Sequence, residues 1–257
     1  RGYRMNKIRA TYRFSFFLVT AVWTVMRIMV SLKLDKQKGQ DYILEVRRKW
    51  VRYTIKRVGV KLDMKGVLPE FEGPAIIVQN HKSYFDPMIA LRLVKAMPVS
   101  KAEVSSWPLI GYLADYTGVL FVQREDRQSR KDTLTGMEQE LKKGNNILIY
   151  PEGTTTADSK TLQFKLGSFR LAAKLGVPVI PMSIEFSKDE DSWIGTDMFL
   201  PHFFKTFGKK EVYIKASVGP AMYSDDPEKL LAEAQQWIDA DILKLRKEFA
   251  EEGIARD

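Results

Sequence analysis

The chain has 257 residues, of which 45% are hydrophobic, and this is enough to fill the core of one large domain or two small ones. It contains no cysteine, which excludes disulfides, thiolate nucleophiles and cysteine–zinc sites and agrees with a cytoplasm-facing protein. It contains two histidines, which argues against a histidine-rich metal centre. The net charge of +9 is uneven, because residues 1–60 carry 15 Lys and Arg against 3 Asp and Glu, whereas the remainder carries 26 against 29.

The basic N-terminal segment also carries long apolar runs. Residues 14–34, FSFFLVTAVWTVMRIMVSLKL, are about long enough to cross a bilayer, although Arg27 lies inside the run. Residues 41–60, DYILEVRRKWVRYTIKRVGV, mix apolar and basic residues in a pattern typical of an amphipathic helix in a membrane interface. The alternative for this second stretch is an ordinary helix packed on the domain.

Together these runs predict a basic helical hairpin over residues 1–58 that anchors the protein on anionic lipids. The expected location is the cytoplasmic face of the inner or plasma membrane, and the first helix either spans or lies in one leaflet. A cleaved signal peptide is disfavoured because no small-residue cleavage site follows the apolar run.

From residue 59 on, β-rich runs alternate with helical ones, which predicts an α/β domain over residues 59–257 with a mainly parallel or mixed sheet flanked by helices. Several runs are apolar without alternation, as expected of strands covered on both faces. The predicted strands are 59–66, 74–80, 97–101, 118–124, 146–151, 177–186 and 211–219. The predicted helices are 87–95, 106–115, 127–143, 165–175 and 226–252. Residues 187–209 are expected to form an irregular surface excursion.

Polar clusters follow three of the predicted strands. Sites in open α/β sheets form beyond the carboxyl ends of the strands, so these clusters are candidates for one common site. They are Asn80, His81 and Asp86 after the second strand, Gln123, Arg124 and Glu125 after the fourth, and PEGTTT at 151–156 after the fifth.

His81 and Asp86 have the residue types of a general base and its orienting partner. A histidine takes a proton from a hydroxyl near neutral pH, and it works better when a carboxylate accepts its other ring N–H. There is no G-x-S-x-G nucleophile motif and no cysteine, so such a base would act on a substrate hydroxyl, in direct group transfer. The alternative is that Asp86 only caps a helix opening at Pro87 and that His81 is a polar loop residue.

The PEGTTT segment has the chemistry of an anion or head-group cradle. Gly153 permits close backbone approach, and the threonine hydroxyls with nearby N–H groups could hold an anion. An ordinary turn is the alternative for this segment. No Walker A pattern occurs, so a nucleotide phosphate loop is not supported.

The motifs NHKSYFD, GVLFVQR, YPEGTTT and VPVIPM, in this order over residues 74–185, resemble the four blocks of the glycerolipid acyltransferase family. This family is typified by 1-acyl-sn-glycerol-3-phosphate (lysophosphatidic acid) O-acyltransferases. The resemblance implies transfer of a fatty acyl group from acyl-CoA or acyl carrier protein to a lysolipid hydroxyl, chiefly that of lysophosphatidic acid, giving phosphatidic acid. The thioester is a substrate, and neither a cofactor nor a metal is expected.

The resemblance also implies roles for individual residues. His81 would be the base and Asp86 its partner. Residues implied in substrate binding are Asn80, Ser83, Lys101, Arg124, Glu152, Gly153, Thr154 and Thr155.

The third block departs from the family pattern, which commonly has Arg at the position of Thr155 as an acceptor-phosphate ligand. Loss of a planar, bidentate donor removes the strongest phosphate clamp at that place. Either Arg124 and Lys101 bind the phosphate, or the acceptor is another lysolipid, such as a lyso-ornithine lipid or a head-group-bearing lysophospholipid.

Other classes of protein remain as alternatives. A non-catalytic lipid-binding module would have no need of the His81–Asp86 pair, and a hydrolase or transacylase could use the same base. A nucleic-acid binder is disfavoured because no groove-reading motif occurs. Met182 and Met198 are candidates for an acyl-chain groove or for plain core, and His202 is expected to be structural or interfacial.

Overall fold

The computed structural model describes residues 2–106, 111, 114, 116–123, 126–195 and 197–254. Within them a single sheet has the strand order β1-β7-β6-β2-β5-β3-β4. The strands are β1 (Val60–Lys65), β2 (Ile76–Gln79), β3 (Ala96–Lys101), β4 (Leu120–Val122), β5 (Asn146–Ile149), β6 (Val179–Phe186) and β7 (Val212–Val218). Every predicted strand is confirmed to within a few residues.

The sheet is mixed, as predicted. Strands β6, β2, β5, β3 and β4 run parallel to one another, β7 is antiparallel to β6, and β1 is parallel to β7. The central register pairs Ile77 of β2 with Leu148 of β5 and with Ile180 of β6. The carboxyl ends of β2, β5 and β3 therefore meet at one edge, where the polar clusters of the sequence are placed.

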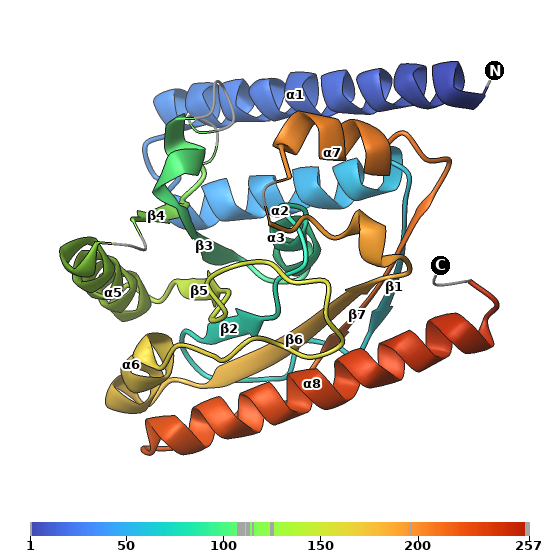
Figure 1. The fold of residues 1–257 in the computed structure, drawn as a ribbon. Coiled ribbons are helices and arrows are strands. Elements are labelled where there is room, and N and C mark those ends of the chain that lie inside the picture. The colour runs from blue at the N-terminus through green and yellow to red at the C-terminus, as the bar shows by residue number, and fades with distance from the viewer. Residues whose placement is uncertain are drawn as a thin grey trace.

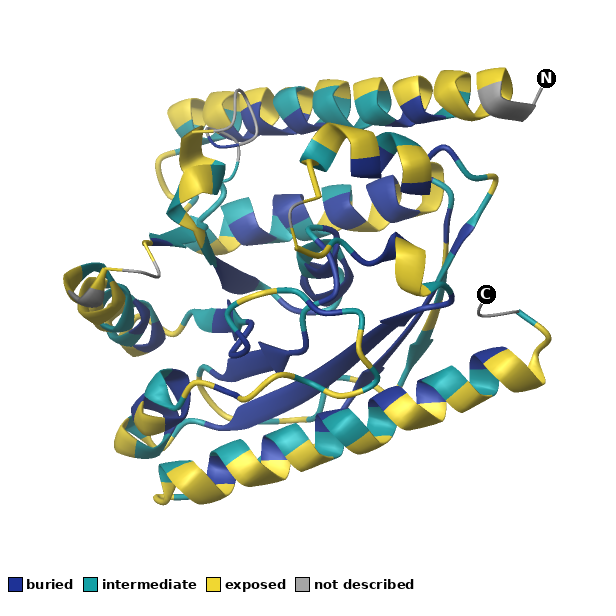
Figure 2. Ribbon diagram, in the orientation of Figure 1, coloured by how far each residue is buried: buried dark blue, intermediate teal, exposed yellow. Residues whose placement is uncertain are grey.

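The central strands are buried on both faces (Figure 2). Ile77 of β2 contributes to the core on one face of the sheet, whereas Ile76 and Val78 contribute to the core on the other. This two-sided burial explains why the strands read as continuous apolar runs. Helices α2, α3 and α7 cover the first face, and α5, α6 and α8 cover the second (Figure 1).

The helices of the domain begin and end largely where the sequence signals place them. They are α3 (Asp86–Leu91), α5 (Arg127–Lys142), α6 (Gly167–Leu175) and α8 (Pro227–Glu251). Asp126 and Asp226 cap α5 and α8 through their side chains, and Gly176 ends α6 in the left-handed conformation. A short 3-10 turn, η1 (Ala102–Ser106), follows β3, and most of the predicted helix 106–115 lies outside the described residues.

The prediction that residues 187–209 are irregular is wrong. This stretch contains the 3-10 turn η2 (Asp189–Asp191) and the helix α7 (Phe199–Thr206). Phe199, Phe203 and Phe207 recur at helical spacing and pack in the core under α7, while Pro201 falls in the first turn, where its missing N–H costs no hydrogen bond.

The N-terminal segment is a pair of helices, α1 (Gly2–Leu34) and α2 (Gln40–Arg57). The apolar side of α2 faces the sheet, and Val51 and Ile55 belong to the same core cluster as β-strand residues. Helix α2 is therefore a helix packed on the domain, which was the alternative to a helix in the membrane interface. Helix α1 lies on the outer side of α2 (Figure 1). The domain boundary at residue 58 stays a prediction. One core cluster includes residues on both sides of it, from Val51 to Val60.

Candidate active site

The loop between β2 and α3 brings His81 and Asp86 together. His81 Nδ1 lies 2.8 Å from Asp86 Oδ2, and the side chain of His81 is 14% exposed while that of Asp86 is fully buried. A carboxylate on Nδ1 selects the tautomer in which this nitrogen carries the proton, so Nε2 is left as the basic nitrogen. The side chains thus have the geometry of a general base and its orienter.

Asp86 organises this loop and does not cap the helix. Its Oδ2 also accepts hydrogen bonds from the backbone N–H groups of Lys82 (2.6 Å) and Ser83 (2.8 Å). Asp86 is itself the first residue of α3, and the cap residue Phe85 makes no side-chain capping bond. One carboxylate oxygen therefore fixes both the turn after His81 and the orientation of the imidazole.

Tyr150, at the end of β5, supports the other side of the imidazole. The two rings stack with centroids 4.2 Å apart, and the Tyr150 hydroxyl donates to Gln79 Oε1 at 3.1 Å. Burial raises the pKa of Tyr150 well above its ordinary value, so the phenol stays protonated. Sequence reasoning missed this residue, whose only signal was its place directly before the PEGTTT segment.

Asn80 and Ser83 are buried with protein partners. The Asn80 amide bonds to both backbone groups of Ile184, accepting from its N–H at 2.8 Å and donating to its carbonyl at 2.9 Å. Ser83 Oγ accepts from the N–H of Phe85 at 3.3 Å. These bonds place both side chains in the framework of the loop, and a direct contact of either with substrate stays a prediction.

Glu152 ties the PEGTTT segment to His81. Its Oε1 accepts from the backbone N–H of His81 and its Oε2 from that of Leu162, each at 2.8 Å. Burial raises the pKa of this carboxyl to about 7, even though the two backbone N–H groups oppose the shift. A further bond from Thr156 N–H to the His81 carbonyl, 3.0 Å, closes the cradle.

A buried ion network holds the base of this cradle. The ammonium of Lys82, which is 1% exposed, lies 3.3 Å from Glu185 Oε2 and also donates to the carbonyl of Asp158. Arg246 of α8 donates to the same Glu185 oxygen at 3.0 Å and to the Ala157 carbonyl at 2.6 Å. The loop after β5 is thereby fixed against both the His81 loop and α8.

The remaining predicted binding residues line the same edge of the sheet. Gly153 has a φ of +76°, which favours glycine, Thr154 is exposed and Thr155 is half-buried. Lys101 is exposed at the end of β3, the strand next to β5. Arg124 lies outside the described residues.

The second histidine is structural, as expected. His202 Nδ1 lies 3.1 Å from the Tyr84 hydroxyl and Nε2 lies 3.0 Å from the Ser192 carbonyl, and burial lowers the pKa of the ring. Met182 is fully buried in the core, which confirms the plain-core alternative for this residue. Met198 is 71% exposed on the segment before α7.

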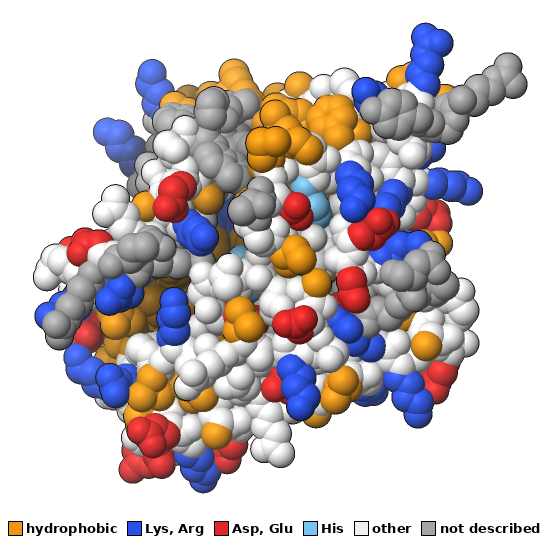
Figure 3. All heavy atoms as spheres, viewed as in Figure 1, with side chains coloured by type: hydrophobic (Ala, Val, Ile, Leu, Met, Phe, Trp, Pro, Cys, Tyr) orange, Lys and Arg blue, Asp and Glu red, His pale blue; other side chains and the backbone are white. Residues whose placement is uncertain are grey.

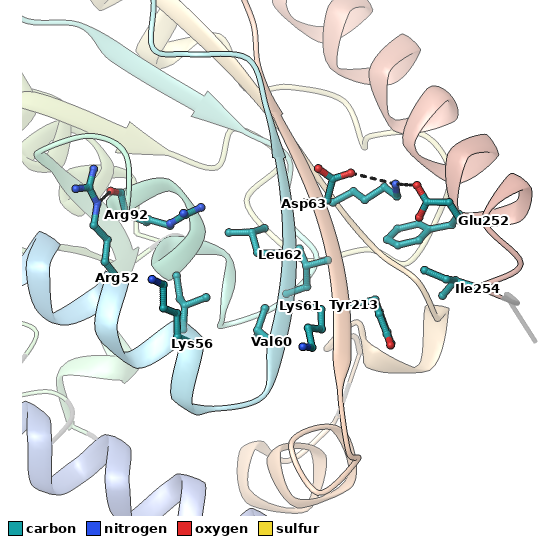
Figure 4. Close-up of a pocket in the computed structure, with 14 residues that line it drawn as sticks. Arg52, Lys56, Val60, Lys61, Leu62, Asp63, Arg92, Tyr213, Glu252 and Ile254 are labelled. Atoms are coloured by element: carbon teal, nitrogen blue, oxygen red, sulfur yellow. Dashed lines mark hydrogen bonds and ion pairs between the residues drawn. The ribbon is translucent and has the colours of Figure 1, made fainter.

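A pocket of about 550 Å³ lies elsewhere, at the outer edge of the sheet beside β1 (Figure 4). Several of its charged side chains already have protein partners: Lys215 bonds to Asp63 at 3.1 Å and to Glu252 at 2.6 Å, and Arg52 donates to the backbone carbonyl of Arg92. Strand β1 is separated from β2 by β7 and β6, so this pocket is distinct from the His81 loop.

Comparisons with known proteins identify the family of the chain and a related fold. A family model described as acyltransferase matches residues 55–185. A lyso-ornithine lipid O-acyltransferase of Pseudomonas aeruginosa is 32% identical over 77% of this chain and 79% of its own length. A chloroplast 1-acyl-sn-glycerol-3-phosphate acyltransferase of Arabidopsis thaliana is 36% identical over 48% of this chain, and the match spans only 36% of that relative. The crystal structure of the 1-acyl-sn-glycerophosphate acyltransferase PlsC from Thermotoga maritima shares the fold, with a TM-score of 0.69 and 23% identity over 94% of this chain and 98% of that one.

Proposed function

The chain belongs to the acyltransferase family, and from this membership we propose that it moves a fatty acyl group from an acyl thioester to the free hydroxyl of a lysolipid. The observation that carries the proposal is the His81–Asp86 pair, 2.8 Å apart, joined by backbone bonds to the PEGTTT cradle inside the matched segment. Acyl-CoA and acyl carrier protein are both candidate donors.

In this proposal His81 Nε2 takes the proton of the acceptor hydroxyl as its oxygen attacks the thioester carbonyl. Asp86 stabilises the imidazolium that forms, because its carboxylate already accepts from Nδ1. The C–S bond then breaks, and the thiolate takes the proton back from Nε2. An ester and a free thiol are produced, and no covalent bond to the protein is made.

Two observations bear on the acceptor. Lysophosphatidic acid is the acceptor that the motif resemblance implies and that the name of the Arabidopsis relative gives. A lyso-ornithine lipid is the second candidate, favoured by Thr155 in place of the common arginine and by the Pseudomonas relative, which matches over most of its length. Both are single-chain lipids with an anionic group and a free hydroxyl.

Helix α1 supports a membrane location, because it is apolar on two opposite sides. One side, with Ala21, Val25 and Ile28, is buried against the protein, and the other is exposed and lies with α7 at the top of Figure 3. A long apolar stripe exposed on a helix, in addition to the side that packs on the protein, is not expected to face water. The exposed stripe consists of Met5, Ile8, Tyr12, Val19, Trp23, Met26, Val30 and Leu34.

By length and composition α1 could cross a membrane, but its contacts favour a helix lying in one leaflet. Near its start Arg13 donates to the carbonyls of Phe207, Lys209 and Lys210 at 2.7–2.9 Å. In its middle Thr20 accepts from Trp50, and near its end Ser31 accepts from Tyr42. A helix held along its whole length presents one face to lipid, so we propose an interfacial anchor on the cytoplasmic face.

The test is thiol release from an acyl thioester, with purified protein in vesicles, comparing wild type with His81→Ala. Release that requires a lysolipid and falls by about 10²–10⁴-fold in the variant supports acyl transfer with His81 as base. Thermal melting of both proteins serves as the folding control. Release without any acceptor points to a thioesterase, and no release with folded, vesicle-bound wild type leaves the lipid-binding module as the function.

A further inference from the structure

Strand β1 forms one edge of the sheet, and the pocket beside it is a groove along this edge (Figure 4). In the sheet of the described residues β1 pairs with a single strand, β7, in parallel. Residues 60–63 of β1 line the groove, with Lys56 of α2 and Glu252 after α8 among the other lining residues. The open edge of a strand presents backbone groups with which another strand can pair.

Alternate residues of β1 direct their backbone groups to this open edge. The N–H of Val212 in β7 donates to the Gly59 carbonyl at 3.0 Å, and the register places Val60 beside Val212. Backbone groups of successive strand residues point to opposite sides, so the odd-numbered residues of β1 bond to β7. The N–H and C=O groups of Val60, Leu62 and Met64 therefore point to the open edge.

The sequence of β1, VKLDMK, is complementary to itself when two copies run antiparallel. Only Val60, Leu62 and Met64 can bond across the edge, so an allowed register places these residues opposite one another. The register centred on Leu62 puts Leu62 opposite its own copy and Val60 opposite Met64. Lys61 then lies opposite Asp63 of the other copy, and this pair occurs twice because the arrangement is symmetric.

The two neighbouring registers that keep the same hydrogen-bond pattern are unfavourable. A register centred on Lys61 places this lysine opposite its own copy. A register centred on Asp63 places two aspartates opposite each other and Lys61 opposite Lys65. Like charges directly opposite one another destabilise a strand pair, whereas opposite charges stabilise it. Charge therefore selects the register centred on Leu62.

Lys61 and Asp63 are exposed enough to meet a second copy, with side chains 59% and 50% exposed. Lys61 lies 3.4 Å from Glu211 in its own copy, and Asp63 contacts Lys215 at 3.1 Å and Lys65 at 3.8 Å, both through Oδ2. Exposed ion pairs of this kind are weak and exchange partners at low cost. Asp63 also has a second carboxylate oxygen, which can accept from Lys61 of the other copy.

The segments that flank β1 are complementary as well. Helix α2 ends in Lys56 and Arg57 shortly before β1, and Glu70 and Glu72 follow β1; all four residues are exposed. Antiparallel pairing brings the start of one β1 beside the end of the other. The basic end of α2 in each copy thereby comes next to the acidic segment of its neighbour.

This pairing also suits the anchor helix α1. A two-fold axis that relates antiparallel strands of one sheet is perpendicular to the sheet, so the same face of the sheet points the same way in both copies. Helix α2 covers that face, and α1 lies on the outer side of α2 (Figure 1). The exposed apolar stripes of both α1 helices would therefore face one membrane.

We propose that β1 is a dimerisation edge, to which a second copy of this chain adds its own β1 in the antiparallel register centred on Leu62. The two seven-stranded sheets become one continuous sheet, and each assembly carries two α1 anchors. Two linked anchors hold a membrane more tightly than one. The inference is independent of the proposed acyl transfer.

Charge reversal tests the pairing. The mass of the full chain in detergent micelles is measured by analytical ultracentrifugation over a range of protein concentrations for wild type, Lys61→Asp, Asp63→Lys and an equimolar mixture of the two variants. Lys247→Asp is the matched control, because Lys247 is an exposed lysine that lies 3.7 Å from Glu251, as Lys61 lies 3.4 Å from its own glutamate. Melting temperatures of all the variants check that they are folded.

Wild type is expected to form a dimer. Either single reversal puts like charges at both pairs and should raise the Kd of the dimer about 10–100-fold. The mixture should recover the dimer, because each reversed position then meets an opposite charge in the other variant. Lys247→Asp should dimerise as wild type does.

Single cysteines test the register, since the chain itself contains none. In the proposed dimer, Lys61→Cys in one copy lies directly opposite Asp63→Cys in the other, with α-carbons about 4.5 Å apart, within the range of a disulfide. Identical positions are diagonal neighbours, about 7–8 Å apart, which is too far. Oxidation of the mixed variants should therefore yield a linked dimer, and each variant alone should yield much less.

Three results would overturn the inference. The first is a wild type that stays monomeric at every concentration, which would leave the groove to another partner, such as an acidic peptide. The second is a folded single reversal that dimerises as tightly as wild type. The third is cross-linking that is equally efficient in the mixture and in each cysteine variant alone.

Discussion

Replacing Asp86 with asparagine separates the chemical role of this residue from its structural one. Asp86 Oδ2 accepts three bonds, from His81 Nδ1, Lys82 N–H and Ser83 N–H, at 2.6–2.8 Å. An asparagine that places its carbonyl oxygen at this position keeps the acceptor but loses the charge. At 2.8 Å and an effective dielectric constant near 20, the lost attraction for an imidazolium is at most about 6 kcal/mol. We expect kcat to fall on the order of 10²–10⁴-fold.

The same substitution should cost little stability. The other oxygen of Asp86, Oδ1, is buried without a hydrogen-bond partner among the described residues. The amide nitrogen of Asp86→Asn would take this position unpaired and should lower the free energy of unfolding by about 1–3 kcal/mol, a loss that removal of the buried charge offsets in part. Asp86→Ala removes the acceptor for three donors and should cost roughly 3–9 kcal/mol, a large part of a typical folding free energy. Thiol release and thermal melting are measured on both variants. A folded Asp86→Asn protein with kcat within about tenfold of wild type would refute the orienting role.

Three further predictions concern stability and membrane binding. Burial raises the pKa of Glu152 from 4.5 to about 7, so between these pH values the folded protein holds a proton that the unfolded chain has released. The stability contributed by the protonated carboxyl is fully present below pH 4.5, and about 3 kcal/mol of it is lost as the pH rises through 7. Urea unfolding between pH 5 and 8 should show this slope in the difference between wild type and Glu152→Gln, because the other titrating groups, including His202, are common to both proteins. Asn80→Ala leaves both backbone groups of Ile184 without their partner and should lower the unfolding free energy by about 2–5 kcal/mol in the same assay, whereas a cost below 1 kcal/mol would contradict the framework role. Val19→Glu on α1 should weaken sedimentation with anionic vesicles about tenfold or more, while Leu243→Glu, at another exposed apolar site on α8, should not; equal losses would argue against α1 as the anchor.

The site is built from backbone bonds as much as from catalytic side chains. Asp86, Glu152 and Asn80 each accept backbone N–H groups from the loops or strands that surround His81. These interactions fix the position of the imidazole before any substrate binds, and preorganisation of this kind is a large part of catalytic efficiency. Substitutions that disturb the framework are therefore expected to lower activity without touching the substrate.

Arg13 of α1 is a residue whose role is defined by its surroundings in the structure. Arg13 was one of many basic residues in the N-terminal segment, and the sequence suggested contact with anionic lipids. In the structure it is 7% exposed and donates to three carbonyls between Phe207 and Lys210. Its charge therefore joins α1 to the end of α7, and lipid contact by basic residues is left to the exposed ones.

The features that depend on neighbours along the chain were predictable from the sequence. The strands were predictable because burial on both faces leaves unbroken apolar runs, and the His81–Asp86 pair because a five-residue loop can close on itself. The motif order was enough to indicate the family. The helix α7 was missed because glycines and a proline masked its phenylalanine spacing.

The set of distant residues that share the site became visible in the three-dimensional arrangement of the strands and loops. Tyr150 stacks on His81 because β5 lies beside β2, a strand order that no local pattern specifies. The side of α2 that faces the sheet was equally ambiguous, since lipid and protein core select the same apolar residues. The loop after β5 folds back on itself because Asp239 and Arg246 of α8 and the buried Lys82–Glu185 pair hold it there. Such contacts depend on the balance of many packed and hydrogen-bonded groups far apart in the chain, so local sequence spacing carries no signal for them.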